Sequence, residues 1–547
     1  MRRLTLWLAL LGIGKIGPVS SSASETKGQD QDALGFLYKE ACPDYTRYST
    51  YLHVPLTDGP LRLPYQRPSI HCRTFSSPLV EKIIKDLTSK ITDPDLARLF
   101  ENAFPNTLDT TVRWHVDGSK KHTELKARGT SDSGKWSGPQ SFVVTGDINA
   151  EWLRDSTNQL LQYQPLAKKD SAIFNLILGA INTQSEFVIQ SPYCNAFQPP
   201  PPSRLSPTQN GQDDTVHPIY EPTVVFECKY ELDSLAAFLA IGNTFHNHTG
   251  SVDFMTPRWY TALETVMSVI EQQSESTFDE ETGKFQKNIY TFSRRTDQGT
   301  ETLPLSGVGN PLNYGTGLVR SAFRPSDDAT ILGFFIPGNA MMAVELERTA
   351  EILRKQGKET LADTVEKRAK TITDGIWEHG VVNHKVYGDV FAYEVDGYGS
   401  HILMDDANVP SLLALPILGF VPTSNKIYQN TRRMLLEKAG NPYYLEGKGF
   451  HGIGGPHIGV EYAWPMSLLM QARTSDNDTE IETCLKYVVD SSRLGLVHES
   501  INVDYIMDYT RSWFAWANSV LAQTVLDLAQ RKPHLIFGEG AEPYVIE

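Results

Sequence analysis

The chain has 547 residues, of which 40% are hydrophobic and 21% are charged, and 65 acidic against 50 basic side chains leave a formal net charge of -15. This composition is that of a globular protein and excludes a disordered or coiled-coil chain. An acidic surplus repels phosphate groups, so nucleic acid and anionic membrane surfaces are poor candidate partners.

The N-terminal segment predicts a secretory signal peptide. Met1-Arg2-Arg3 is followed by an apolar run over residues 4–14, by Pro18 and by small residues around Ala23. This order is typical of a signal peptide, so we expect residues 1–23 to be removed. An uncleaved anchor is the alternative, although the apolar run is shorter than the roughly 20 residues that span a bilayer. No later segment is expected to span a membrane. The predicted location is the secretory pathway: secreted, or retained in the Golgi or the cell wall.

Five cysteines fit that compartment. The sequence-local pairs are Cys42–Cys72 and Cys194–Cys228, which leave Cys484 free and buried. None has the CxxC spacing of a zinc or redox site, so such a site is not expected, and we predict no cofactor. Sequons at Asn247 and Asn477 fit a glycoprotein.

Hydrophobic residues recur with helical period along most of the remaining chain. These patterns predict helices over 79–103, 171–188, 231–246, 257–273, 339–355, 359–377, 409–418, 425–438, 479–490 and 514–530. Strand-like alternation is confined to 385–387 and 391–393, and a proline-rich stretch near 198–214 reads as a surface insertion. We therefore predict an all-α fold with a single domain over 24–547, built as a toroid of helical hairpins whose long loops form a site at one end.

Three loop segments combine acidic residues with arginine and tryptophan and contain almost no lysine. They are 145–156, 323–329, and 497–500 with its continuation 510–518. Each has an ordinary alternative: Ser326 before two aspartates is a good helix start, Arg154 and Asp155 suit a structural ion pair, and Glu499 suits a solvated loop. Together they favour a polar cleft with two separated carboxylates, which glycoside hydrolysis requires as proton donor and proton acceptor.

At these residues the sequence resembles glycoside hydrolase family 125, exo-α-mannosidases that act on α-1,6-linked mannose, and in particular its fungal secreted members. The resemblance runs from about residue 75 to 530. It is carried by the segments 146–156, 193–197, 227–234, 323–329, 452–457, 498–500 and 511–518.

The resemblance implies an (α/α)6 barrel and an inverting mechanism without a metal. It implies that Glu499 is the general base and that Asp327 or Asp328 is the general acid, and Asp327 is preferred by looser analogy to other helical-barrel glycosidases. A helix start at Ser326 would stabilise the carboxylate, whereas an acid needs a raised pKa, so burial would have to prevail. The residues expected to hold the substrate are Arg154, Asp155, Ser156, Asn195, His457, Arg511 and Trp513.

The expected partner is therefore an α-mannoside oligosaccharide or glycan. The nearest alternative is another helical-barrel exo-glycosidase, such as a glucoamylase-like enzyme. A catalytically silent mannose-binding protein of the secretory pathway is a second alternative, and a scaffold is a third. The presence of both Asp327/Asp328 and Glu499 favours an enzyme, because a lectin needs no proton donor and acceptor.

Overall fold

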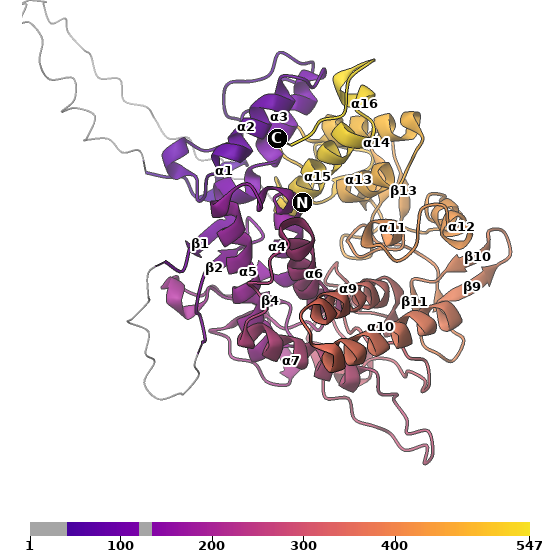
Figure 1. Ribbon diagram of the computed structural model, residues 1–547. Helices are drawn as coiled ribbons and strands as arrows, with labels where there is room; N and C mark the ends of the chain where they lie inside the picture. The colour runs from indigo at the N-terminus through magenta and orange to yellow at the C-terminus, as the bar shows by residue number, and fades with distance from the viewer. Residues whose placement is uncertain (1–40, 120–133, 547) are drawn as a thin grey trace, which may run out of the picture. The chain divides into compact units, whose positions relative to one another are not determined.

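A computed structural model of the protein describes residues 41–119 and 134–546. The expected signal peptide lies outside these residues. Pro43–Glu547 form one compact unit, whose ribbon is shown in Figure 1. Its helices are α1 (Tyr45–Tyr48), α2 (Pro78–Thr88), α3 (Pro94–Ala103), α4 (Leu153–Leu161), α5 (Ser171–Gln190), α6 (Leu232–Thr249), α7 (Pro257–Gln273), α8 (Pro304–Gly307), α9 (Ile336–Lys355), α10 (Glu359–His379), α11 (Leu415–Leu418), α12 (Lys426–Leu435), α13 (Pro465–Arg473), α14 (Asp478–Ser491), α15 (Ala515–Arg531) and α16 (His534–Phe537).

The helix-rich architecture confirms the predicted fold class in its main feature, although several boundaries differ. The predicted helix over 79–103 is two helices, because Asp93 caps a new helix that begins at Pro94. The helix predicted over 409–418 shrinks to Leu415–Leu418, because a loop with the cis peptide Val409–Pro410 precedes it. The sequence patterns missed α4 and α13.

Five helices form the centre of the unit, and we call them the axial helices: α4, α6, α9, α13 and α15. Among them, α4 packs on α6 and α15, α6 packs on α9, and α13 packs on α15. Other helices pack against the axial helices, as α10 packs on α9, α14 on α13 and α5 on α6. Ile336, Ala340, Ala343 and Leu346 of α9 are all buried, as their helical spacing predicts.

Short antiparallel strands directly precede several of the axial helices. The strands are β1 (Val112–Val116), β2 (Gln140–Val143), β3 (Glu151–Trp152), β4 (Ala196–Phe197), β5 (Asp214–His217), β6 (Val225–Glu227), β7 (Thr291–Arg294), β8 (Phe334–Phe335), β9 (Val381–His384), β10 (Gly388–Phe391), β11 (Glu394–Val395), β12 (His401–Ile402), β13 (Tyr444–Glu446), β14 (His451–Ile453), β15 (Tyr462–Ala463) and β16 (Ile501–Asn502). They pair as β1-β2, β3-β4-β6, β5-β7, β8-β11-β12, β9-β10, β13-β14 and β15-β16. Three of them, β3, β8 and β15, end within two residues of the start of α4, α9 and α13, so the pairing fixes where those helices begin.

Strand content exceeds the prediction. The segment 385–387 is the turn between β9 and β10, and only Phe391 of the segment 391–393 belongs to a strand. Most of the strands have two to four residues, which is too short for alternation to stand out in a sequence. The proline-rich stretch is mostly exposed between 201 and 214, as predicted for a surface insertion.

The N-terminal caps divide the helices into two groups. Side chains cap α2, α3, α5, α7, α12 and α14. The axial helices have no side-chain cap, and the residues before them are large: Trp152, Glu231, Phe335, Trp464 and Phe514. The residue before each of these helices therefore provides no capping side chain, although Ser321 accepts a hydrogen bond from the amide of Leu232 at the start of α6.

One helix corrects the expectation that no segment after the leader is apolar enough to span a membrane. By length and composition Ser171–Gln190 could do so, but 78% of its most apolar window is buried inside the unit. A core helix passes the same test, and α5 packs on α6, α7 and β2. The predicted disulfide Cys194–Cys228 is present, and Cys484 is free and buried as expected. Cys42 and Cys72 are likewise disulfide-bonded cysteines.

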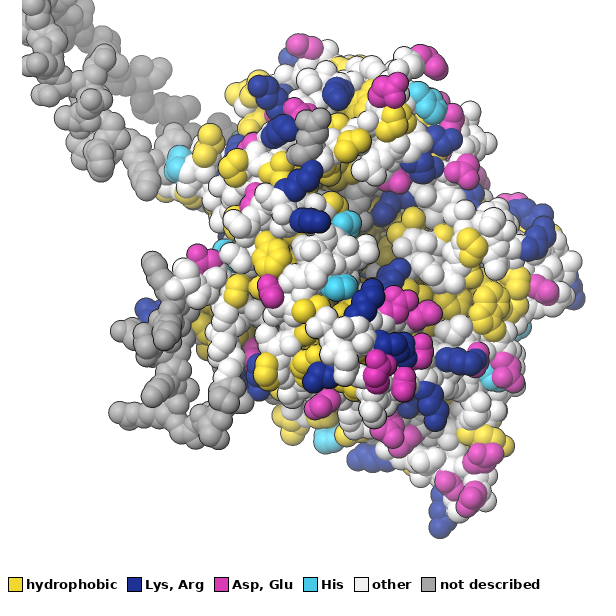
Figure 2. Space-filling view, in the orientation of Figure 1, with side chains coloured by type: hydrophobic (Ala, Val, Ile, Leu, Met, Phe, Trp, Pro, Cys, Tyr) yellow, Lys and Arg dark blue, Asp and Glu magenta, His cyan; other side chains and the backbone are white. Residues whose placement is uncertain are grey.

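Charged side chains of both signs are mixed on the surface shown in Figure 2, where lysine and arginine lie beside aspartate and glutamate. The acidic surplus of the chain is therefore spread among basic groups on this face. Such a face has no single strong sign of charge to attract a charged polymer.

Candidate active site

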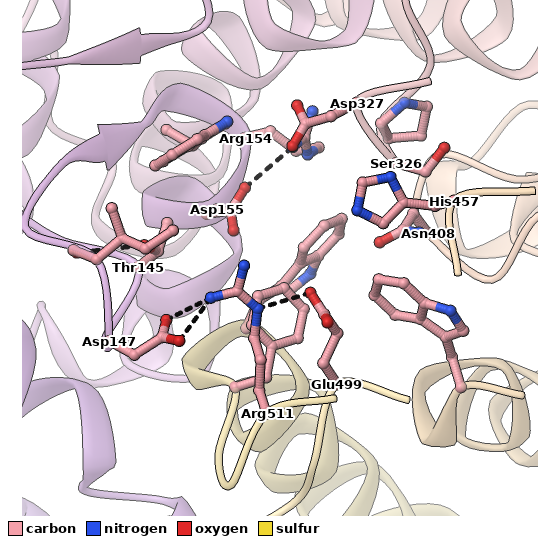
Figure 3. Close-up of a pocket in the computed structure, with 16 residues that line it drawn as sticks. Thr145, Asp147, Arg154, Asp155, Ser326, Asp327, Asn408, His457, Glu499 and Arg511 are labelled. Atoms are coloured by element: carbon pink, nitrogen blue, oxygen red, sulfur yellow. Dashed lines mark hydrogen bonds and ion pairs between the residues drawn. The ribbon is translucent and has the colours of Figure 1, made fainter. Parts of the chain in front are cut away.

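A pocket with an empty volume of about 450 Å³ lies where the N-terminal ends of α4, α13 and α15 meet the loops before α9 and α11 (Figure 3). Its walls come from segments far apart in the sequence, including all three of the predicted loop segments. The lining residues are Thr145, Asp147, Ile148, Trp152, Arg154, Asp155, Pro325, Ser326, Asp327, Asn408, His457, Trp464, Glu499, Arg511, Phe514 and Trp516.

The structure brings most of the predicted site residues to this pocket. The residues that line it are Arg154, Asp155, Asp327, His457, Glu499 and Arg511. Asp328, Ser156, Asn195 and Trp513 are buried around it but do not line it. The sequence analysis did not single out Asp147, Trp152, Asn408 or Trp464 as site residues.

Glu499 lies in the loop after α14 and is held by two donors. Thr510 donates from its hydroxyl to Oε2 of Glu499 at 2.7 Å, and Arg511 donates from Nε to Oε1 at 2.9 Å. Arg511 also donates from Nη1 to both carboxylate oxygens of Asp147, at 2.7 and 2.6 Å. Burial opposes the charge on Arg511, but Glu499 and Asp147 outweigh it and raise the pKa of Arg511 above its usual range. Arg511 thus fixes the orientation of Glu499 toward the pocket.

His498 anchors the same loop and carries no charge. Its ring stacks on Tyr509 with centroids 3.9 Å apart, and Nδ1 lies 2.8 Å from the carbonyl oxygen of Arg511. Burial lowers the pKa of His498 to about 4. A neutral, stacked histidine therefore joins the two arms of the loop that present Glu499 and Arg511.

Asp327 lies at the tip of a tight turn, and this corrects the alternative of a helix start at Ser326. The turn is closed by a bridge between Phe323 and Ala329, and Asp327 has a φ of 67°, in the left-handed region. Arg324 anchors the turn, because its Nε donates to Glu394 at 2.6 Å in the interior. The next helix after this turn, α9, begins only at Ile336, so no helix dipole at the turn itself acts on Asp327.

Asp327 is surrounded by polar groups of β4, β6 and the approach to α6. Asn195 donates from Nδ2 to Asp327 at 3.1 Å and to Glu231 at 3.1 Å, so one amide nitrogen links the two carboxyl groups. Burial favours the neutral form, but the charges of Lys229 and Arg154 outweigh it and lower the pKa of Asp327 to about 2. Burial, only partly offset by Arg154, raises the pKa of Glu231 well above its usual value.

Arg154 lies on the floor of the pocket and is held by three carboxyl groups. Nη1 lies 2.5 Å from Glu231 and 3.3 Å from Asp233, and Nη2 lies 3.2 Å from Asp155. The guanidinium also stacks 5.3 Å from the ring centroid of Trp516. Burial, opposed by Arg154, raises the pKa of Asp155 to about 6. Arg154 and Asp155 therefore form the structural ion pair that was the ordinary alternative, and both of them also line the pocket.

Asp328 does not line the pocket but acts on it through His457. Oδ1 of Asp328 lies 3.5 Å from Nδ1 of His457, and the hydroxyl of Ser326 donates to Oδ2 at 3.1 Å. Burial favours the neutral imidazole, but Asp328, with Asp327 and Glu499, raises the pKa of His457 to about 9. His457 therefore presents a positive charge to the pocket at neutral pH.

Ser156 and Trp513, two of the predicted substrate-binding residues, pack behind the pocket and do not line it. The hydroxyl of Ser156 donates to Glu151 at 2.9 Å and accepts a hydrogen bond from Gln184 at 2.7 Å, inside the helix packing. Trp513 lies against Gly146, where an added Cβ would come within 2.9 Å of the indole. Gly146 has a φ of 128°, so only glycine fits both the backbone and the space at the turn that carries Asp147.

The arrangement suits acid–base chemistry on a neutral, hydroxyl-rich ligand. Asp327 and Glu499 extend toward the pocket from opposite sides in Figure 3, with Arg154 beside Asp327, Arg511 beside Glu499, and Asp155 and His457 on the two flanks. Trp152, Trp464 and Trp516 supply flat apolar walls of the kind that sugar rings contact. In the described part of the chain, no group of three potential metal ligands lies in this pocket.

Comparisons with known proteins agree with this chemistry. The sequence profile of the metal-independent α-mannosidases (GH125) matches residues 93–526. The "Meiotically up-regulated gene 157 protein" of Schizosaccharomyces pombe is 54% identical over 498 residues, which cover 91% of this chain and 94% of that protein.

A solved structure is also similar. It is a metal-independent α-mannosidase of Streptococcus pneumoniae in a non-productive complex with α-1,6-mannobiose, from work on the processing of N-linked glycans. The two chains are 30% identical with a TM-score of 0.71, and the match covers 83% of this chain and 99% of that one.

Proposed function

Because the chain belongs to the family of metal-independent α-mannosidases, GH125, we propose that it removes terminal, non-reducing α-1,6-linked mannose from an oligosaccharide or glycan, with inversion at the anomeric carbon. Membership of the family makes the protein a glycoside hydrolase that acts on α-mannosides. The linkage, the exo mode and the stereochemistry are the proposed part.

The observation that carries the proposal is the pair of Asp327 and Glu499 on opposite sides of one pocket. Asp327 is the general acid that protonates the leaving oxygen, and Glu499 is the general base that takes a proton from the attacking water. An inverting glycosidase needs this division of roles. Glu499 suits the base because Arg511 and Thr510 orient its carboxylate oxygens.

The choice of Asp327 over Asp328 rests on position. Asp327 lines the pocket, whereas Asp328 is paired with His457 and hydrogen bonded to Ser326 outside the lining. Neighbouring residues of a turn point in different directions, so only one of the two reaches the ligand. Asp328 instead keeps His457 charged for a substrate hydroxyl.

The linkage and the exo mode rest on two supports. The structurally similar Streptococcus pneumoniae protein was solved with α-1,6-mannobiose. The second support is the limited empty volume of the pocket, about 450 Å³, which suits the end of a glycan better than the middle of a polymer. The axial helices, their outer partners and this similarity also support the (α/α)6 barrel that we propose as the complete topology.

The location that we propose is the secretory pathway, with secretion, Golgi residence and cell-wall retention as its possible end points. The buried disulfide Cys194–Cys228 supports it, because such bonds persist in oxidising compartments. The rival functions are disfavoured: an α-mannosidase family does not predict a glucosidase, and a mannose-binding protein needs no acid and base in its pocket.

The proposal is tested with purified protein and mannobioses that differ only in linkage. We expect release of mannose from α-1,6-mannobiose and much slower release from the α-1,2 and α-1,3 isomers. A longer α-1,6-mannooligosaccharide labelled at its reducing end should become shorter by one sugar at a time. Binding without release would indicate a lectin, and internal cleavage would contradict the exo mode.

A further inference from the structure

Four carboxyl groups share a cluster with two buried cations, and His457 acts on Asp327 from the pocket as a third positive charge. Asp155, Glu231, Asp233 and Asp327 surround Arg154 and Lys229, and all of these side chains are buried, apart from the face of Asp327 that lines the pocket. Lys229 is shared with a further carboxylate, Glu227, at 3.4 Å. If every acid were ionised, the cluster would carry an excess of negative charge away from water. Such an excess is unfavourable, so the cluster retains at least one proton.

The geometry identifies the two groups that share this proton. Asp327 and Glu231 accept hydrogen bonds from the same amide nitrogen of Asn195, and two carboxylates held this close together in the interior repel each other unless one of them is protonated. Asn195 donates to both of them at 3.1 Å, so the amide holds the two carboxyl groups side by side. Asp327 faces the pocket, whereas Glu231 lies behind it with 1% of its surface exposed.

The surroundings place the proton on Glu231 when no substrate is bound. Burial acts on both groups, but Lys229, Arg154 and His457 favour the ionised form of Asp327, whose pKa is about 2. Burial and the charge of Asp327 raise the pKa of Glu231. The other charged or titratable groups that face the pair are Asp155, Asp233 and Tyr290.

We propose that Glu231 stores the proton that Asp327 delivers to the leaving oxygen, so that the pair, and not Asp327 alone, supplies the acid. The inference rests on the proposed function. The O–H bond of Glu231 breaks as an O–H bond forms on Asp327; that proton then passes to the glycosidic oxygen as its bond to the anomeric carbon breaks. Water attacks the carbon and gives its proton to Glu499, and solvent then takes one proton from Glu499 and returns one to the pair.

The first test uses Glu231→Gln with two substrates. The glutamine can still accept hydrogen bonds from Arg154 and from Ser234, which bonds Glu231 at 2.7 Å, but it cannot supply a proton. On α-1,6-mannobiose, which needs acid assistance, we expect kcat to fall by about 10- to 100-fold. On 2,4-dinitrophenyl α-mannoside, whose leaving group needs little assistance, kcat should stay near the wild-type value.

The second readout is the pH profile with mannobiose. In the wild-type protein the alkaline limb reports loss of the shared proton. In Glu231→Gln the proton must reside on Asp327, whose pKa the cations hold low, so the alkaline limb should move to lower pH and activity should partly recover on acidification. A role in folding alone would not shift this limb.

Asp233→Asn is the matched control, because Asp233 also lies against Arg154, at 3.3 Å, but does not face the pocket. It removes one negative charge from the cluster without removing the partner of Asp327, so the ratio of the two kcat values should remain that of the wild type. Equal losses on both substrates, or an unmoved alkaline limb in Glu231→Gln, would overturn the inference. Wild-type protein that released no mannose would instead contradict the proposed function.

Discussion

Arg511 donates a hydrogen bond from Nε to Oε1 of Glu499 at 2.9 Å, and through Nη1 it reaches Asp147 on the other side. The guanidinium therefore joins the loop after α14 to the turn at Gly146, and the orientation of Glu499 depends on both. A carboxylate held in this way keeps one edge directed toward a water molecule in the pocket.

Replacing Glu499 with Gln should remove the general base and leave the fold intact. We expect kcat on α-1,6-mannobiose to fall by about 10²- to 10⁴-fold, the usual contribution of a positioned acid or base. Tm measured by calorimetry should stay close to that of the wild type, since the amide oxygen can still accept from Arg511 and the amide NH2 can donate to the hydroxyl of Thr510. Near-normal turnover would rule out Glu499 as the base.

Asp327→Asn and Asp328→Asn should separate the two candidate acids. Loss of Asp327 is expected to lower kcat on mannobiose by about 10²- to 10⁴-fold, with a much smaller loss on an activated aryl mannoside. Loss of Asp328 removes the charge opposite His457 and should act mainly on KM, with similar changes for both substrates. The reverse pattern would assign the acid to Asp328.

Inversion predicts that the first product is β-mannose. Proton NMR recorded during the first minutes of hydrolysis, before mutarotation, should show the β anomer ahead of the α anomer. In an inverting enzyme the two carboxyl groups lie about 6.5–9.5 Å apart, which leaves room for the water. Early accumulation of α-mannose would indicate retention and a covalent intermediate.

The charged state of His457 should make part of the stability depend on pH. Its pKa is about 9 in the folded protein, against about 6.5 in an unfolded chain. The stabilisation is therefore fully present below about pH 6.5 and is lost as the pH rises through 9. Because about a third of this side chain is exposed, we expect on the order of 1 kcal/mol.

Urea denaturation of the wild type and of His457→Gln at pH 6, 8 and 10 measures this contribution. The difference in unfolding free energy should be largest at pH 6 and smallest at pH 10. A difference that stayed constant over this range would show that His457 is neutral in the folded protein.

The disulfide Cys194–Cys228 should support both stability and activity. Its cysteines are 34 residues apart, and a bond that closes such a loop contributes about 3–4 kcal/mol to stability. Asn195 and Lys229 directly follow the two cysteines, so the double variant Cys194→Ala/Cys228→Ala should also lose activity. Cys484→Ala, which removes the free buried thiol, is the control and should cost about 1 kcal/mol.

Guanidinium denaturation and initial rates on mannobiose provide both readouts. A double variant as stable as Cys484→Ala would show that the bond does not hold the chain together here. A double variant that is destabilised but hydrolyses mannobiose at the wild-type rate would show that the disulfide stabilises the fold without being needed to position the residues around Asp327.

The sequence predicted most of the outer and long axial helices because their buried faces repeat with helical period. It predicted α7 with its observed bounds, and α10 to within two residues. It missed α4, because Arg154, Asp155, Ser156 and Thr157 are polar and yet buried in the site and its supporting network. Hydrophobic periodicity cannot detect a helix whose buried face is polar.

Only part of the site could be predicted, because its contacts also depend on how distant segments pack together. Motif composition indicated Arg154, Asp155, Asp327, His457, Glu499 and Arg511, which line the pocket. It did not indicate that Asn195 bonds both Glu231 and Asp327, because those contacts join residues 36 and 132 positions apart and depend on the tertiary fold. Glu231, the residue before α6, belongs to the segment 227–234 that carries the family resemblance. Its role follows only from its burial, which the sequence does not show.

The position of α15 has a consequence for biosynthesis. This helix packs between α13 and α4, and the segment that leads into it carries Thr510, Arg511 and Phe514. Until that segment has left the ribosome, Glu499 has no arginine beside it and the pocket lacks one of its walls. A chain still being translated would therefore be unable to trim glycans, and the enzyme would become competent only when its final axial helix joins its first.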